Sequence, residues 1–280
     1  SKSGQGGCIL GHMEYALTQP QTEQYGRDGY LSPLNIFSEA EVRAFRTAFE
    51  RFERSHGDLA AGLRTDLHLL EKWAWQAVTD RRVIDPVVSV LGENVLLWSM
   101  NWFIKEAHDG KYVSMHQDAN YWGLEPHDIC TAWIAVSDAT PAAGPMFFLP
   151  GSHRGELYKH ENTFAQDNLL TRGQVAQTDV NDDDTKLAPL NAGQMSLHHV
   201  RILHGSDANS SSDRRIGMVL RFCATHVRQT KGADTAVLVN GVDSYGNFDL
   251  LPQPSEDNGQ QEQRRHEDAV QKMSRLIMMD

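Results

Sequence analysis

The stretch MHQDANYW, from Met115 to Trp122, decides both the fold and the chemistry of this chain. Its setting, after a turn at Asp109-Gly110, predicts a β-strand that runs into a loop. Because side chains alternate along a strand, we expect His116 and Asp118 to point to the same side. One imidazole and one carboxylate on a common face supply two of the ligands that a metal ion needs.

A third ligand has to come from another part of the chain. The best candidate is His204 in the run RILHGS, which is followed eleven positions later by Arg215 on another apolar strand. Two histidines and one carboxylate, with coordination positions left open, are the arrangement of non-haem Fe(II) oxygenases. His198 and His199 compete for the third place, but neither has the Gly-Ser continuation or an arginine at this distance.

Further motifs accompany these ligands. A His-x-Asp triplet alone is weak evidence, because the chain has 13 histidines and 37 acidic residues. Between the first and last ligand, however, lies GPMFFLPGSHR, from Gly144 to Arg154. Together, the His-x-Asp pair, the Pro-Gly-Ser-His turn, the distal His-Gly-Ser and the spaced arginine resemble the phytanoyl-CoA dioxygenase family of Fe(II)/2-oxoglutarate oxygenases. The resemblance covers about Gln24 to Thr230, which is one domain's worth of chain.

The resemblance implies a catalytic centre and a reaction class. It implies that His116, Asp118 and His204 are the metal ligands and bind Fe(II), with 2-oxoglutarate as co-substrate and O2 as oxidant. In halogenating relatives, Ala or Gly replaces the carboxylate and leaves room for chloride. Since Asp118 is present here, we expect a hydroxylase of the 2-oxoglutarate-dependent dioxygenase type, an oxidoreductase that does not halogenate.

Four residues are expected to bind the co-substrate. Arg215 offers a planar fork to a carboxylate, which suits the distal end of 2-oxoglutarate. The alternative, a surface arginine, fits the neighbouring Arg214 better. By resemblance, Ser206 adds a hydroxyl at that end, while Asn101 and Trp133 match positions that line the co-substrate. Asn101 lies in an otherwise apolar strand, where a buried amide needs a partner.

Three residues are expected to contact the substrate. By resemblance, Tyr121 and Trp122 face it from the loop at the barrel mouth, although packing at the rim is the alternative. If no bulge intervenes, Arg221 shares the interior face of its strand with Arg215. A second interior cation would suit an anionic substrate. His153, in the Pro-Gly-Ser-His turn, is expected to hydrogen-bond locally without a catalytic role.

Composition narrows the class of protein. The net charge of −11 and a pI near 5.6 argue against nucleic acid as a partner. No apolar run approaches the roughly 20 residues that span a bilayer, and no signal peptide is visible, so we expect a cytoplasmic protein without a membrane partner. Cys8, Cys130 and Cys223 are an odd set without metal-finger spacing, so a disulfide framework is not expected.

The order of the elements predicts the fold class. Helices come first and many short strands follow, which indicates a mainly β structure with α-helices: a double-stranded β-helix, or jelly-roll, cupin-like barrel, packed against N-terminal helices. Residues 1–12 resemble an added tag, and 13–280 are expected to form a single oxygenase domain. Within it we expect a helical part at 20–92, a jelly-roll core at 94–228 and a C-terminal extension at 229–280.

Several elements are predicted individually. A capping box at Ser38 starts a helix, Leu67 to Val78 form another, and Asp85-Pro86 opens a third. Val95 to Ile104 and Lys111 to His116 are expected to pair as a hairpin. Further strands are expected at Ile129 to Val136, Met146 to Leu149, Gln194 to His199 and Arg215 to Ala224. The polar run 160–188 is expected to be a solvated insertion near the barrel mouth, and an amphipathic helix is expected to end the chain and pack on the barrel or on a second subunit.

The expected function is hydroxylation of a small molecule, first of all a short anionic or zwitterionic compound such as an amino acid or an aminoalkylphosphonate. Acyl-CoA, another lipid, or a natural-product scaffold are the alternative substrates, because fold and ligands do not set specificity. A non-catalytic, metal-binding cupin-like barrel and a dioxygenase that uses no 2-oxo acid are alternative functions. The protein is expected to be a monomer or a homodimer.

Overall fold

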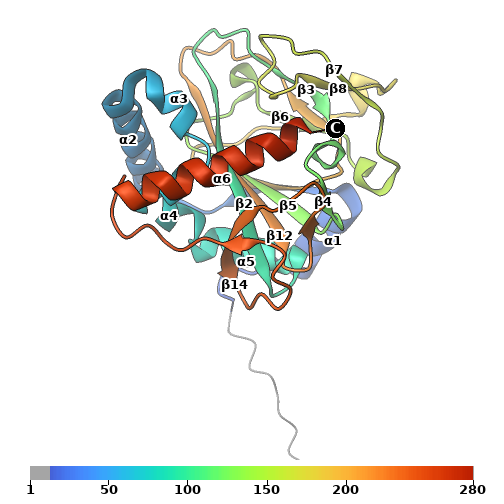
Figure 1. The fold of residues 1–280 in the computed structure, drawn as a ribbon. Coiled ribbons are helices and arrows are strands. Elements are labelled where there is room, and N and C mark those ends of the chain that lie inside the picture. Colours follow the sequence, from blue (N-terminus) through green and yellow to red (C-terminus); the bar gives the residue numbers. More distant parts are fainter. Residues whose placement is uncertain (1–12, 280) are drawn as a thin grey trace, which may run out of the picture.

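The computed structural model describes residues 13–279 and consists of two β-sheets with helices around them (Figure 1). The expected tag at residues 1–12, including Cys8, lies outside the described residues. The α-helices are α1 (Gln19–Asp28), α2 (Glu39–His56), α3 (Ala60–Leu63), α4 (Lys72–Val78), α5 (Arg81–Leu91) and α6 (Gln260–Met278). The 3-10 helices are η1 (Gly57–Leu59), η2 (Leu67–Leu69), η3 (Asp118–Asn120), η4 (Pro141–Ala143), η5 (Ser152–Arg154) and η6 (Asp182–Asp184).

The larger sheet has seven strands in the order β1-β10-β5-β12-β2-β14-β15. Their bounds are β1 (Tyr30–Asn35), β2 (Val95–Lys105), β5 (Ile129–Ala135), β10 (Gln194–His199), β12 (Arg215–Ala224), β14 (Thr235–Asn240) and β15 (Asp249–Leu250). The smaller sheet has the order β3-β11-β6-β9, with β3 (Val113–His116), β6 (Met146–Phe148), β9 (Lys186–Ala188) and β11 (His204–Ser206). Two ribbons pair β4 (Leu124–Glu125) with β13 (Arg228–Gln229) and β7 (His160–Asn162) with β8 (Gln174–Ala176).

The central strands of the larger sheet are buried on both faces, which explains their nearly unbroken apolar sequences. Along β12, one set of alternate side chains packs in the core beneath the helices: Ile216, Met218, Leu220 and Phe222. The same core includes Phe49 and Phe52 of α2 and residues of α5, and in Figure 1 the helices α2 to α4 are grouped beside the sheet. The other set of β12 side chains therefore faces the barrel interior.

The interior between the two sheets holds a second apolar cluster. Trp133 of β5 and Val219 of β12 meet Met146 and Phe148 of the smaller sheet there. Two sheets that enclose a core between them, with helices on the outside of the larger one, form the jelly-roll that the element order predicts. The fold class is thus confirmed.

Local signals for helix and strand ends agree with several predictions. Ser38 caps α2: its hydroxyl accepts from the amide of Glu41 at 3.3 Å, and its own amide donates to the Glu41 carboxylate at 2.8 Å. The bounds of β10 and β12 coincide with the predicted strands. In these places the sequence pattern and the tertiary structure require the same conformation.

Three predictions about elements are wrong. β2 and β3 do not pair as a hairpin, because β2 lies in the larger sheet and β3 in the smaller one. The segment Leu67 to Val78 is divided between η2 and α4, since the helix restarts after Glu71, which has an extended conformation. Pro86 lies inside α5 instead of opening it, because Asp80 caps this helix by accepting from the amide of Arg82 at 2.9 Å.

The segment 160–188 is structured. It forms the β7-β8 ribbon and then β9, which pairs with β6 at the edge of the smaller sheet. The hydroxyl of Ser114, on β3, donates to the carbonyl of Gln174, on β8, which ties the ribbon to the barrel. The segment therefore forms β-structure that its polar sequence did not predict, while most of its described side chains are exposed or half-buried, as expected of a solvated insertion.

The predicted C-terminal helix is present as α6. Its buried side chains include Ala269, Met273 and Leu276, which pack within this chain. Figure 1 shows α6 crossing in front of the sheets. Among the described residues, no helix combines the length and the apolar character needed to cross a membrane.

Candidate metal centre

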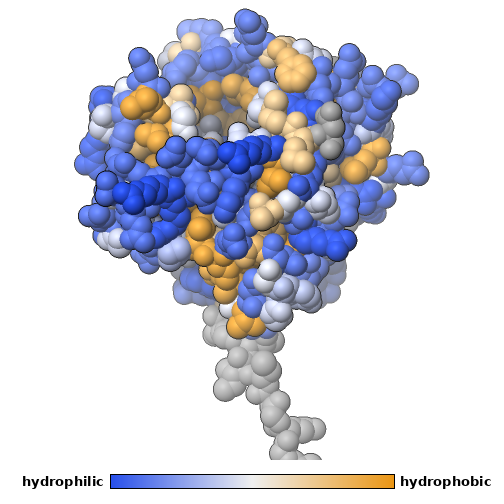
Figure 2. Space-filling model, viewed as in Figure 1, coloured by the Kyte–Doolittle hydropathy of each residue, from blue (hydrophilic) through white to orange (hydrophobic). Residues whose placement is uncertain are grey.

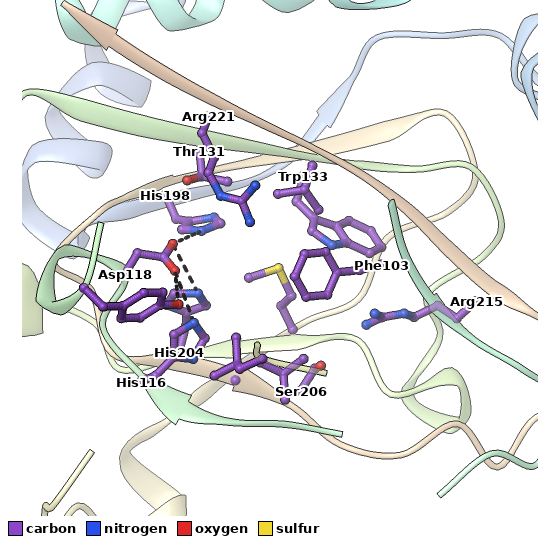
Figure 3. A pocket seen from close by; sticks show the side chains of 16 residues that line it. Phe103, His116, Asp118, Thr131, Trp133, His198, His204, Ser206, Arg215 and Arg221 are labelled. Atoms are coloured by element: carbon purple, nitrogen blue, oxygen red, sulfur yellow. Dashed lines mark hydrogen bonds and ion pairs between the residues drawn. The ribbon is translucent and has the colours of Figure 1, made fainter. Parts of the chain in front are cut away.

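The smaller sheet brings the predicted ligands together. His116 and His204 are cross-strand partners in β3 and β11, with ring centroids 4.2 Å apart. β3 ends at His116, so Asp118 belongs to η3, but the extended backbone of Gln117 keeps Asp118 on the same side. One ligand atom from each of the three residues lies within 4.8 Å of the others, and all three residues are buried (Figure 3).

The hydrogen bonds of the two histidines leave one ring nitrogen of each for the site. His116 Nδ1 lies 2.8 Å from the Ser114 carbonyl, and His204 Nδ1 lies 3.0 Å from the Ile202 carbonyl. Since a carbonyl only accepts, each Nδ1 donates, and in the neutral ring Nε2 then carries a lone pair. These Nε2 atoms lie 3.3 and 3.8 Å from Asp118 carboxylate oxygens. Three electron-pair donors converge here, which fits a bound cation.

Burial and charge set the protonation of the site. Burial lowers the pKa of His204 to about 4, which favours the neutral ring that a metal requires. Burial would raise the pKa of Asp118, but the contact with His116 and the charges of His204 and Arg221 outweigh it and hold that pKa well below its usual range. Tyr121 donates its hydroxyl to Asp118 Oδ1 at 3.2 Å. The site is thus prepared to present the Asp118 carboxylate and the neutral imidazole of His204.

A third histidine, His198, borders the three candidate ligands. His198 Nε2 lies 4.0 Å from Asp118 Oδ2, and the His198 and His204 ring centroids are 4.8 Å apart. His198 Nδ1 is buried and has no hydrogen-bond partner among the described residues. His199 points elsewhere: its ring packs 5.3 Å from that of His153 and its Nδ1 accepts from the Arg201 amide.

Arg215 lies at the opposite end of the same pocket (Figure 3). Its side chain is buried, donates to the Gly144 carbonyl at 2.8 Å and lies 5.2 Å from the Trp133 ring centroid. Burial lowers the pKa of Arg215 to about 9, so the guanidinium keeps its charge at neutral pH. Ser206 lines this pocket as well. A buried cation with a free Nε needs an anionic partner there.

Lys105 is a residue that sequence reasoning missed. It ends β2 directly opposite Arg215 on β12, and its side chain is fully buried. Its ammonium donates to Ser206 Oγ at 2.7 Å, to the Asp207 carbonyl, and to the Gly144 carbonyl at 3.4 Å. Burial, reinforced by the charge of Arg215, lowers the pKa of Lys105 to about 6. A lysine at the end of an otherwise apolar strand was the available signal.

The remaining predicted residues divide between two cavities. Trp133 lines the pocket between the metal centre and Arg215, and Asn101 does not: it lines a larger outer cavity, with its amide donating to Thr65 Oγ1 at 2.9 Å. Trp122 also lines the outer cavity. Tyr121 and Arg221 border both cavities.

His153 has the structural role expected of it. Its Nε2 lies 3.2 Å from the Gly26 carbonyl, and a Cβ on Gly29 would lie 2.4 Å from His153 Nδ1. Gly29 ends α1 with a φ of +81°, which favours glycine. The Pro-Gly-Ser-His turn therefore locks α1 against the barrel.

This fold and this site define a class of enzyme: a jelly-roll oxygenase with a facial arrangement of two histidines and one carboxylate. A family model described as phytanoyl-CoA dioxygenase (PhyH) matches residues 25–217. The chain belongs to this family. It is a 2-oxoglutarate-dependent dioxygenase, with Fe(II), 2-oxoglutarate and O2 as cofactor and co-substrates.

Individual relatives are moderately similar. A probable alpha-ketoglutarate-dependent hypophosphite dioxygenase of Stutzerimonas stutzeri is 30% identical, over 72% of this chain and 68% of that protein. An ectoine dioxygenase of Bordetella parapertussis is 28% identical, over 51% of this chain and 52% of its own length. Among solved structures, the apo form of the non-heme monooxygenase ThoJ has a TM-score of 0.83 and 30% identity, and the match covers 92% of this chain and 97% of that one.

Proposed function

We propose that this protein hydroxylates a small molecule and that its co-substrate binds between the metal centre and Arg215. In this proposal His116, Asp118 and His204 hold Fe(II). The observation that carries it is the arrangement of one pocket: three convergent ligand atoms lie at one end, and at the other lies a buried guanidinium whose Nε has no partner among the described residues. A dicarboxylate with a 2-oxo group fits these two ends, because one end chelates a metal and the other is an anion.

The residues of this pocket would bind and orient the co-substrate and shield it from water. When bound, the iron supplies the redox centre that activates O2 while 2-oxoglutarate is oxidised to succinate and CO2. Arg215 and the Ser206 hydroxyl would hold the distal carboxylate, and Trp133 would pack along the co-substrate. The rest of the pocket wall is largely apolar and excludes water; it includes Phe103, Val113, Met146 and Val219.

We further propose that the substrate carries an anionic group, as in an amino acid or an aminoalkylphosphonate. Arg221 supports this, because it faces the metal centre and forms no ion pair within the described part of the chain (Figure 3). A relative is named for hypophosphite, a small anion. Acyl-CoA and natural-product substrates are the competing class. Action in the cytoplasm, independence of nucleic acid, and a monomeric or homodimeric state stay predictions from sequence.

The test of the co-substrate site is an anaerobic titration of the Fe(II)-loaded protein with 2-oxoglutarate. The weak visible charge-transfer band of the chelate should appear, and Arg215→Ala should lower the 2-oxoglutarate affinity by at least about thirtyfold, because a buried charge loses its partner. Arg228→Ala, an exposed arginine on β13, is the matched control and should bind normally.

The same titration separates the alternative functions. If iron binds but no band forms, the chain acts either as a metal-binding barrel or as a dioxygenase that uses no 2-oxo acid. If the band forms, succinate release can be screened with amino acids and aminoalkylphosphonates against acyl-CoA thioesters. Release with the thioesters alone would contradict the anionic small-molecule proposal.

A further inference from the structure

A second cavity opens from the metal pocket toward the C-terminal helix. Its volume is about 340 Å³, against about 50 Å³ for the metal pocket. The two share Phe103, Tyr121, Leu170 and Arg221 as lining residues, so they adjoin each other. Figure 2 shows the molecular surface hollowed beside the hydrophilic side chains that α6 turns to solvent. The outer cavity therefore offers space for a molecule of moderate size beside the metal centre.

The charged side chains that line this outer cavity are all positive. Arg64, Lys111 and Arg221 line it, and none of its described lining residues is acidic. Arg64 is ion-paired with Glu53, and Lys111 Nζ lies 3.5 Å from a carboxylate oxygen of Asp109. Arg221 is the lining cation for which the described residues provide no such pair. A cavity of this kind attracts anions.

Arg221 has donors to spare beside the metal centre. It donates to Ser99 Oγ at 3.2 Å and to Asn101 Oδ1, and its guanidinium lies 5.0 Å from the Trp122 ring centroid. Its Nε is buried and has no partner among the described residues. In Figure 3 the guanidinium points into the space between the metal ligands and Trp133. A carboxylate or phosphonate there would receive charge-assisted hydrogen bonds.

Much of the remaining lining of the cavity is apolar and comes partly from α6. Met273 and Ile277 of this helix line it, and so does Trp98 of β2. The family model ends at residue 217, so both α6 and Arg221 lie beyond the part of the chain that the model covers. Trp98 and Tyr121, which also line the cavity, lie within that part.

We propose that the outer cavity selects substrates of two parts: an anionic group bound by Arg221 and an apolar body that packs against Trp98, Trp122 and α6. This inference rests on the proposed function, since it names the substrate class of the same site. A small inorganic anion would leave the apolar walls uncovered, and a neutral lipid would leave Arg221 without a counter-charge. Because Arg221 faces the metal ligands, the oxidised C–H bond lies near the anionic group.

The test is a calorimetric titration of the anaerobic Fe(II)·2-oxoglutarate protein with three probes. Hexanoate has both parts, acetate lacks the body, and hexanamide lacks the charge; hexylphosphonate is titrated in parallel as a second anion. Hexanoate should bind more than about tenfold more tightly than either acetate or hexanamide. If acetate binds as tightly as hexanoate, the site for the apolar body is refuted. If hexanamide binds as tightly as hexanoate, the site for the anionic group is refuted.

Variants assign the two parts to residues. Arg221→Gln should abolish the advantage of hexanoate over hexanamide. Ser274→Phe, at the cavity wall on α6, should weaken the binding of hexanoate and leave that of acetate unchanged. Gln271→Phe, on the same helix but outside the lining of this cavity, should change the affinity for neither probe. If Arg221→Gln lowers the affinity for 2-oxoglutarate and leaves the affinity for hexanoate unchanged, Arg221 binds the co-substrate and the inference is overturned.

The charge-transfer band separates this inference from the proposed function. A normal band in a protein that binds none of the probes overturns the substrate class alone. A band that never forms means that the proposed function itself has failed.

Discussion

Two adjacent histidines on β10 show how one position along a strand separates two roles. His198 faces the metal centre with Nε2 4.0 Å from Asp118 Oδ2, and His199 faces the turn that holds α1. A shift of about 1 Å would bring His198 Nε2 within hydrogen-bond distance of the Asp118 carboxylate, where it would fix the orientation of that group when a metal is bound. Partners of this kind tune metal affinity without touching the metal.

His198→Phe should therefore lower the Fe(II) affinity by about 10- to 100-fold while the fold stays intact. The phenyl ring keeps most of the volume and removes both ring nitrogens. Anaerobic Fe(II) titration followed by equilibrium dialysis measures the change. His199→Phe is the matched control, and equal losses in the two variants would show that ring packing, not the contact with Asp118, matters.

Lys105 decides which way the Ser206 hydroxyl points. Although burial lowers the pKa of Lys105 to about 6, a carboxylate held by Arg215 would favour the ammonium form, which only donates, so Ser206 Oγ accepts from it at 2.7 Å and keeps its own hydrogen free. That hydrogen is then available to a carboxylate held by Arg215. The buried lysine would act through the serine, as a positioning residue for the co-substrate.

Lys105→Met should weaken 2-oxoglutarate by about tenfold, which corresponds to one hydrogen bond to a charged group. In a Ser206→Ala background the same change should cost less, because the hydroxyl that it orients is already gone. The charge-transfer titration reports both affinities. An equal loss in both backgrounds would mean that Lys105 acts on the carboxylate through its charge instead.

The two faces of the β-strands have different roles: one packs against the helices and the other lines the site. Alternate residues of β12 anchor the helices or face the pocket, and the register irregularity against β2 comes only after Arg221. The condition stated for Arg221, that no bulge precedes it, is therefore met. Position 217 requires glycine, because a Cβ there would lie 2.2 Å from the Trp133 ring. Glycine leaves room for that indole.

The 3-10 helix η2 is tied to β2 by Asp66. The Asp66 amide donates to the Met100 carbonyl at 2.7 Å, and the Asp66 carboxyl accepts from the Met100 amide at 2.7 Å. Burial raises the pKa of Asp66 from 3.8 to about 7, against the opposing effect of that amide and of Arg221. The folded protein therefore holds a proton on Asp66 that the unfolded chain has already lost.

Between about pH 4 and pH 7, the free energy of unfolding should fall with rising pH because of this group, with a slope of up to about 1.4 kcal/mol per pH unit. Asp66→Asn keeps the acceptor and removes the titration. The stability of the wild type relative to this variant, from urea unfolding at several pH values, should decrease across that window. Parallel pH profiles would exclude Asp66 as the source.

Elements were predictable where local pattern and tertiary structure agree. The capping box of α2 and the apolar runs of β10 and β12 satisfy both. The turn at Asp109-Gly110 resembles a hairpin turn locally, but β2 finds its partners in β12 and β14, which are distant in sequence. The segment 160–188 has too little apolar periodicity to reveal its strands, since they form at the barrel edge.

The site is assembled from both sheets, which limits what a sequence reveals about it. His116, Asp118 and His204 are recognisable because metal chemistry restricts the residue types and their spacing. The pairing of Lys105 with Ser206, and the position of α6 over the outer cavity, depend on contacts between segments more than 100 residues apart. Such contacts leave no local pattern.

Because the two histidine ligands lie on the smaller sheet and Asp118 follows it directly, away from the core beneath the helices, metal binding and folding should be separable. Fe(II) with 2-oxoglutarate, each at about a hundredfold excess over its dissociation constant, should stabilise the wild type by at least about 2.7 kcal/mol. His204→Ala should retain its secondary structure and lose this stabilisation, because the ring that completes the three-ligand set is gone.

Thermal unfolding of both proteins under argon, with and without metal and co-substrate, measures the difference, and circular dichroism reports the fold. The metal-free variant should unfold at a somewhat lower temperature than the metal-free wild type, since removing a buried ring leaves a cavity. Loss of secondary structure in the variant would make His204 part of the folding core. An undiminished stabilisation by Fe(II) and 2-oxoglutarate would instead remove His204 from the ligand set and return His198, the nearest other imidazole, as the candidate.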